Sequence, residues 1–193
     1  MRSNHSKYPK WGGASMSSTR RAVLRGAAAL ALTGLDALLV PSVRAKAVRV
    51  GERAPPATLV TLDGRRLATT DLLGHVVILT FWATWCVPCR QELPLLSDYA
   101  SRHAAQGLSV LGFSLDTPER LPQVTQIART LSFPVGLLDN SNAAGYGRMW
   151  KIPANFTIDG QGLLVDNGWN DKEATWTQER LDRIVTPLLK NST

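Results

Sequence analysis

The sequence of 193 residues predicts an α/β domain, in which a largely parallel sheet carries helices on both faces and is closed by a hairpin. Strand-like segments alternate with helical ones through the second half of the chain. Residues 76–82 form a nearly unbroken apolar run, which is typical of a strand buried on both faces. Residues 155–158 and 163–165 flank a turn at 159–162, and this spacing predicts the closing hairpin.

The other elements follow from the same patterns. Residues 58–62 predict a strand that ends in a turn at Asp63-Gly64. After the central strand, a helix is predicted from Val87 to about Ala105, and Gly107 is a typical helix-terminating residue. Residues 108–115 predict the next strand.

The C-terminal half continues this alternation. Thr117-Pro118-Glu119 predicts a helix start, with proline at the first helical position. The buried stripe of this helix is expected to comprise Leu121, Val124, Ile127, Ala128 and Leu131. Residues 133–138 predict a short strand. The last helix has Thr175 and Gln178 as a capping box, and Pro187 interrupts it.

The net charge of +7 is confined to the first 47 residues, which hold eight Lys or Arg and the single acid Asp36. Residues 48–193 hold fourteen basic and fourteen acidic residues. This part of the chain therefore lacks the excess of basic residues that is typical of nucleic-acid binding, and we expect no nucleic-acid partner.

Residues 1–47 predict an export signal. Thr19–Arg25 resembles the twin-arginine consensus, and Ala45-Lys-Ala47 has the small-x-small form of a cleavage site. We predict a cleaved signal peptide. A retained anchor is the alternative, because the apolar stretch from Gly26 to Val43 is marginal against the roughly 20 residues that span a bilayer. Residues 48–193 would then form one domain that works in the periplasm.

Cys86 and Cys89 are the only cysteines, and they lie where the central strand meets the next helix. The unpaired N–H groups of the first helical turn and the helix dipole favour a thiolate on Cys86. The pair therefore indicates a redox dithiol, in which Cys86 is exposed and attacks, and Cys89 resolves the mixed disulfide. Pro88 is expected to stiffen the segment between the two cysteines, and the Trp85 side chain is expected to lie beside the dithiol.

Other uses of the cysteine pair fit less well. A zinc site needs two more ligands, but there is no third cysteine and the three histidines are scattered. A purely structural disulfide would stabilise little, because the loop that it closes is so short. A peroxidase would need an isolated peroxidatic cysteine. We expect no metal, and no cofactor other than the redox-active disulfide Cys86–Cys89.

Residues 82–89, Trp-Ala-Thr-Trp-Cys-Val-Pro-Cys, resemble the active site of the thioredoxin superfamily. The continuation Arg-Gln-Glu-Leu-Pro, residues 90–94, is similar to its TlpA/ResA-like branch, which includes the CcmG/DsbE reductants. The similarity runs from about Val50 to Leu189. It implies the thioredoxin fold, a central mixed sheet flanked by helices, with an N-terminal β-hairpin extension and a central helix–strand insertion at residues 117–138.

The resemblance also implies roles for three further residues. Pro153 would be the cis-proline that faces the dithiol, and Ile152 would offer its backbone to the substrate chain; an ordinary trans proline is the alternative. Glu92, one turn after Cys89, would exchange protons with the thiols, unless it is an exposed carboxylate that only adds solubility. Thr80 replaces the buried aspartate of many thioredoxins, so a proton relay would depend on Glu92.

This family likeness implies an exported thiol–disulfide oxidoreductase that reduces disulfides in client proteins, in cytochrome c maturation or copper-oxidase assembly. A membrane electron donor of the DsbD/CcdA type would recharge it, and we expect a monomer. A disulfide-forming oxidase or isomerase is the alternative among enzymes. A copper chaperone using two thiolates as soft ligands is the alternative of another class, although such relatives carry a wider cysteine spacing and a distal histidine.

Overall fold

The computed structural model describes residues 48–170 and 174–189, and the predicted leader lies outside this part of the chain. Within it, seven strands form a two-stranded and a five-stranded sheet. No helix among these residues is both long enough and apolar enough to cross a membrane. The strands are β1 Thr58–Val60, β2 Arg66–Ala68, β3 Val76–Trp82, β4 Leu108–Ser114, β5 Val135–Leu137, β6 Ala154–Ile158 and β7 Leu164–Asn167.

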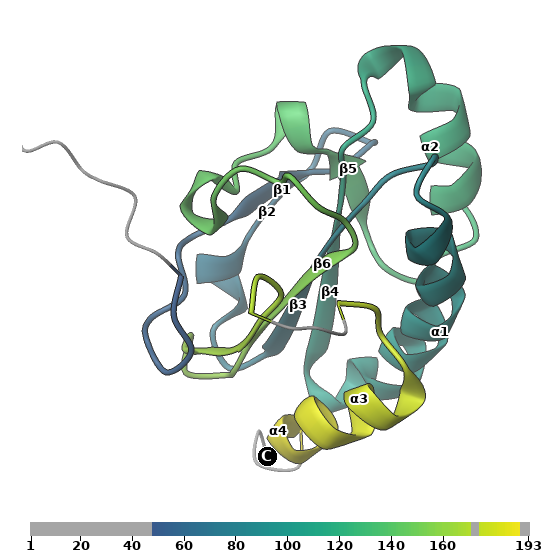
Figure 1. Cartoon of the computed structure of the whole chain (residues 1–193). Coiled ribbons are helices and arrows are strands. Elements are labelled where there is room, and N and C mark those ends of the chain that lie inside the picture. The colour runs from purple at the N-terminus through teal and green to yellow at the C-terminus, as the bar shows by residue number, and fades with distance from the viewer. Residues whose placement is uncertain (1–47, 171–173, 190–193) are drawn as a thin grey trace, which may run out of the picture. The chain divides into compact units, whose positions relative to one another are not determined.

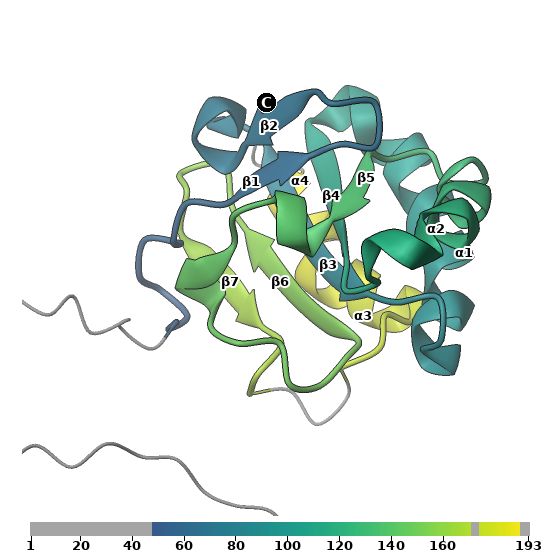
Figure 2. The same ribbon diagram turned by 90° about the horizontal axis from the view of Figure 1, so that it is seen from above.

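The main sheet has the strand order β5-β4-β3-β6-β7 (Figure 2). β3 pairs in parallel with β4 and antiparallel with β6, so the sheet is mixed. The predicted closing hairpin is formed by β6 and β7, which are antiparallel. The predicted N-terminal hairpin is also confirmed: β1 pairs antiparallel with β2, and Gly64 in the turn has a φ of 86° that favours glycine.

The apolar run of β3 is explained by its place in the middle of the sheet. All seven of its residues are buried. Side chains alternate across a strand, so Ile78 and Trp82 enter one core while Leu79 and Phe81 enter the other. The strand therefore needs apolar residues on both faces, and it ends at Trp82, four residues before Cys86.

The two faces of the main sheet are covered differently (Figure 1). The α-helices supply side chains to the core on one face. The opposite core is closed by the β1–β2 hairpin and by short 3₁₀ helices, including Ala144–Tyr146. Helices thus flank the sheet as predicted, but those on the second face are 3₁₀ turns. The α-helices are α1 Val87–His103, α2 Leu121–Ala128, α3 Gln178–Ile184 and α4 Thr186–Leu189.

The insertion between β4 and β6 departs from prediction at its start. A 3₁₀ turn, Pro118–Arg120, precedes α2. Thr117 is at its N-cap position, but the Thr117 side chain makes no capping hydrogen bond. Val124 is buried as expected, but Leu121 is 40% exposed and does not belong to the buried stripe. Leu121 is the first residue of α2 and directly follows the 3₁₀ turn, so the buried stripe begins one helical turn later, at Val124. The strand of the insertion, β5, pairs in parallel with β4 as an edge strand.

The helix ends are set by local signals. Gly107, the glycine predicted to terminate the helix, adopts a left-handed φ of 83° after α1. The predicted Thr175–Gln178 capping box is wrong: α3 begins after Thr177, whose hydroxyl accepts a hydrogen bond from the Arg180 amide at 3.2 Å. The break predicted by Pro187 is present, because α3 and α4 are separate helices on either side of Val185.

Candidate active site

The two cysteines form a disulfide at the N-terminus of α1. Cys86 is the N-cap residue, and its Sγ accepts a hydrogen bond from the Cys89 amide at 3.3 Å. This amide is one of the donors that a helix leaves unpaired in its first turn. When the pair is reduced, the same donor and the helix dipole stabilise negative charge on Cys86.

The cysteines differ in accessibility. Cys86 retains 5% of its surface and Cys89 none, so Cys86 is less exposed than predicted but remains the one that another protein can reach. Its two neighbours in the sequence are exposed: Trp85 is 57% exposed and Val87 is 54% exposed. Pro88 lies in the first turn of α1, where a missing N–H costs no helical hydrogen bond.

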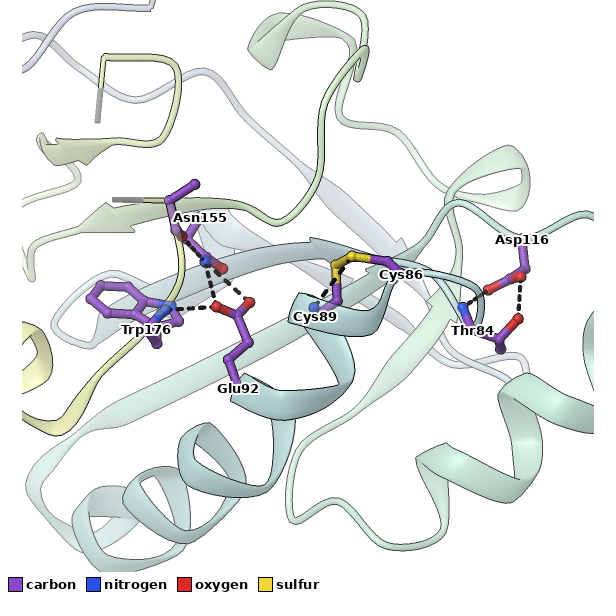
Figure 3. The surroundings of a disulfide bond; sticks show 8 residues. Thr84, Cys86, Cys89, Glu92, Asp116, Asn155 and Trp176 are labelled. Carbon is purple, nitrogen blue, oxygen red and sulfur yellow. Dashed lines mark hydrogen bonds between the residues drawn. A yellow bond between two sulfur atoms is a disulfide. The ribbon is translucent and has the colours of Figure 1, made fainter. Parts of the chain in front are cut away.

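The loop before Cys86 is anchored by Asp116, a residue that the sequence patterns did not identify. The buried Asp116 carboxylate accepts hydrogen bonds from the Thr84 amide at 2.7 Å and from its hydroxyl at 2.6 Å. Ser114 donates a third hydrogen bond at 2.8 Å. β3 and β4 are parallel, so their carboxyl ends meet at one edge, where the loop after β4 reaches the active-site loop (Figure 3).

We expect Asp116→Ala to destabilise the protein by about 2–4 kcal/mol, because it leaves three donors without their charged acceptor. Urea unfolding of the oxidised protein measures this loss. Asp139→Ala is the matched control, since Asp139 is an exposed aspartate at the start of another 3₁₀ turn. Equal free energies of unfolding for the two variants would contradict the anchoring role.

Glu92 is buried, with 1% of its surface exposed. The alternative of an exposed carboxylate that only adds solubility is therefore excluded. Its carboxylate accepts hydrogen bonds from Asn155 Nδ2 at 3.2 and 3.3 Å and from the Trp176 amide at 2.6 Å (Figure 3). Asn155 comes from β6 and Trp176 from the segment before α3, so the site is assembled from three distant parts of the chain.

Burial in this environment raises the pKa of Glu92 from 4.5 to about 7. The Trp176 and Asn155 hydrogen bonds and the charge of Arg180 oppose this shift, because they favour the carboxylate. Glu92 therefore changes protonation state near neutral pH, which is what a group that exchanges protons with thiols requires. Thr80 is also buried and is the β3 neighbour of Asn155, but it does not titrate in this range.

The bond between Ile152 and Pro153 is cis, as the resemblance implied. Pro153 is buried directly before β6. Ile152 is half-buried and packs against the core cluster that contains both cysteines. The predicted cis-proline segment and the disulfide are thus parts of one packed region.

The remaining aromatic residues divide between core and surface. Trp82 and Tyr146 are fully buried, so neither contributes to a docking surface. Trp150 is 73% exposed and stacks on Trp169, with ring centroids 5.6 Å apart and planes 10° from parallel. Within residues 48–170 and 174–189, no three His, Cys, Asp or Glu side chains gather where they could hold a metal ion.

The chain is similar to several known proteins. The AhpC/TSA family model matches residues 50–166. The thioredoxin-like protein YneN of Bacillus subtilis is 31% identical over 137 residues, which are 69% of this chain and 79% of YneN. The thiol-disulfide oxidoreductase ResA of Geobacillus thermodenitrificans is 34% identical over 61% of this chain and 68% of its own length.

A solved structure is similar as well. The crystal structure of a thiol:disulfide interchange protein of the thioredoxin family from Chlorobium tepidum aligns with a TM-score of 0.60 and 27% identity. The alignment covers 75% of this chain and 99% of that protein.

The fold and the site define a thiol–disulfide oxidoreductase: a thioredoxin-type sheet carries a Cys-x-x-Cys disulfide at the N-terminus of its first helix. The enzyme class includes the protein disulfide reductases. The chain belongs to the AhpC/TSA family.

Proposed function

We propose that this protein is an exported reductant that transfers electrons from its Cys86–Cys89 dithiol to disulfides in client proteins. The observation that carries the proposal is the disulfide at the start of α1 with the buried, titratable Glu92 one turn behind it. This arrangement combines a stabilised thiolate, a resolving thiol and a proton acceptor on one rigid helix.

The reaction has two exchange steps. The Cys86 thiolate attacks a client disulfide, forms a mixed disulfide, and releases one client sulfur as a thiolate. Cys89 then loses its proton and attacks Cys86 Sγ, so that the Cys86–Cys89 bond forms and the second client sulfur leaves. Two electrons pass to the client, whose two thiolates take up two protons.

Glu92 is proposed to accept the Cys89 proton in the second step. It lies three residues after Cys89 on α1. Because its pKa is about 7, about half of Glu92 is ionised at neutral pH, whereas an ordinary thiol with a pKa of about 8.5 still holds its proton. Transfer to Glu92 leaves the thiolate that the second step needs.

Client binding is assigned to the residues around Cys86. The exposed Trp85 ring and Pro88 would contact the client near its disulfide, and the Ile152 backbone would pair with an extended client segment before Pro153. Trp150 precedes β6 and Trp169 follows β7, and the two rings stack on each other. This pair would extend the apolar surface that contacts the client.

The place of the reaction is proposed from the leader and the relatives. The twin-arginine-like segment supports export to the periplasm, with the N-terminal segment either removed or retained as an anchor. The resemblance of residues 82–94 to the TlpA/ResA-like branch supports a role in cytochrome c maturation or copper-oxidase assembly. A membrane donor of the DsbD/CcdA type would return two electrons to the disulfide of the monomer.

A reductant needs a dithiol that gives up electrons readily. We expect the reduction potential of the Cys86–Cys89 pair to lie toward the thioredoxin end of the known range, near about −270 mV, rather than near about −120 mV. Equilibration with glutathione or dithiothreitol buffers, followed by alkylation and mass spectrometry, measures the reduced fraction. A value near −120 mV would overturn the reductant proposal and favour a disulfide-forming oxidase.

A further inference from the structure

A largely buried ion pair, Arg180 with Asp166, lies close to Glu92. Arg180 of α3 is 1% exposed, and its Nη2 lies 2.8 Å from Asp166 Oδ2 on β7. The guanidinium is also 4.2 Å from the centre of the Trp176 ring, in cation–π contact. A buried ion pair adds little net stability on average, because both charges lose water. The contacts of Arg180 with neighbouring groups are therefore more informative than its contribution to stability.

The pair is connected to Glu92 through the segment before α3. Arg180 Nη1 donates a hydrogen bond to the Ala174 carbonyl at 3.3 Å. The same carbonyl accepts a hydrogen bond from Asn155 Nδ2 at 2.8 Å. An amide can satisfy this carbonyl only with its NH₂ end, so Ala174 determines which end of Asn155 faces Glu92.

Asn155 consequently presents its NH₂ group to both carboxylate oxygens of Glu92. Trp176, two residues after Ala174, adds the backbone donor at 2.6 Å (Figure 3). All three hydrogen bonds are donated to Glu92, so they favour its charged form. Both the Trp176 amide and the orientation of Asn155 depend on the segment that Arg180 contacts.

The charged and titratable groups around Glu92 come from three elements. Cys86 and Cys89 lie on its own helix, Arg180 on α3, and Asp166 on β7 beyond Arg180. β6 contributes the neutral amide of Asn155. Arg180 is thus the positive charge that offsets burial of the carboxylate, and it acts both directly and through the segment that it holds.

We propose that Arg180 is a positioning residue for the exchange reaction: paired with Asp166, it holds Ala174 and Trp176 against Glu92 and keeps that side chain as a carboxylate that can take the Cys89 proton. The inference rests on the proposed function, in which Glu92 is the proton acceptor. The transfer breaks the Cys89 S–H bond and forms an O–H bond on Glu92, and the resulting Cys89 thiolate then attacks Cys86.

The test is an Arg180→Gln variant, which removes the positive charge but keeps a polar side chain. Loss of this charge raises the pKa of Glu92, so we expect its titration, followed by carboxyl ¹³C NMR, to move up by about one unit. At pH 7 the ionised fraction of Glu92, and with it the rate of disulfide exchange, should then fall about fivefold, and the rate should recover by pH 9. Arg183→Gln is the control, because Arg183 is an exposed arginine on the same helix.

A second pair of variants separates this inference from the proposed function. In a Glu92→Gln background, Arg180→Gln should leave the exchange rate unchanged, since its effect passes through Glu92. If Glu92→Gln alone keeps the wild-type pH profile, the role of Glu92 as proton acceptor fails. If Glu92→Gln changes the profile but Arg180→Gln leaves the Glu92 titration at its wild-type position, only the Arg180 inference fails.

Folding is checked by circular dichroism. If Arg180→Gln does not fold, the same NMR titration of Glu92 is carried out on Arg180→Lys instead. Lysine keeps the charge but lacks the planar fork that joins Asp166 to the Ala174 carbonyl. A shifted Glu92 titration in the folded lysine variant supports the inference, and an unshifted one overturns it.

Discussion

Replacing Cys89 by alanine is expected to stop turnover and to leave the client protein covalently attached to Cys86. The first exchange needs only Cys86, which is the N-cap residue of α1 and is 5% exposed. The second exchange needs Cys89, which is fully buried behind it. Without the resolving thiol, the mixed disulfide should accumulate as a species that reducing agents release.

The matched control is Cys86→Ala. It should be equally inactive but should capture no client, because Cys89 is not accessible to another protein. Non-reducing gels and mass spectrometry distinguish the two variants. Capture by Cys86→Ala together with no capture by Cys89→Ala would reverse the two roles.

The captured client also identifies the pathway when the Cys89→Ala variant is produced in its native host. Recovery of an apocytochrome or a copper-binding oxidase subunit would support the proposed maturation role. Recovery of many unrelated exported proteins would instead indicate a general oxidase or isomerase and would contradict that role.

The second large effect is expected from Glu92→Gln, which removes the proposed proton acceptor. Loss of a general base typically slows a reaction by about 10²–10⁴-fold. The wild-type rate of client reduction should rise as Glu92 ionises around pH 7, whereas the glutamine variant should lack this rise. Stopped-flow measurements between pH 5 and 9 test this, with the exposed Glu179→Gln as control. Identical profiles for wild type and Glu92→Gln would rule out the acceptor role.

Stability provides a readout of the same group that does not depend on activity. The folded pKa of Glu92, about 7, is above its ordinary value of 4.5, so between these values the folded state binds more protons than the unfolded state. The contribution of Glu92 to stability is therefore complete below about pH 4.5 and is lost as pH rises through 7. The loss amounts to about 3 kcal/mol, and it should be absent from Glu92→Gln in urea unfolding measured at pH 5 and pH 8.

Much of this fold could be predicted because it depends on local patterns. The apolar run of β3 requires a strand buried on both faces, and Gly107 marks the end of the α1 region by its left-handed φ of 83°. The Cys-x-x-Cys pair between strand and helix predicted the site of the disulfide. These signals lie within a few residues of the structure that they determine.

Where local patterns competed, neighbouring residues decided the outcome. Thr175 and Gln178 have capping-box spacing, yet Thr177 caps α3 because its hydroxyl meets the Arg180 amide. Leu121 continues the apolar stripe in sequence, yet α2 begins at this residue, after a 3₁₀ turn, and Leu121 is exposed. Spacing alone does not say at which residue a helix begins.

The fold class, the two cysteines and the position of Glu92 one turn behind them could be derived from the order of the residues. The burial of Glu92 could not, because its partners Asn155 and Trp176 are 63 and 84 positions away. The anchoring of Thr84 by Asp116, 32 positions away, and the pairing of Arg180 with Asp166 were decided in the same way. Such contacts follow no period along the chain: they exist because parallel strands end at one edge and because the segment before α3 folds back over α1.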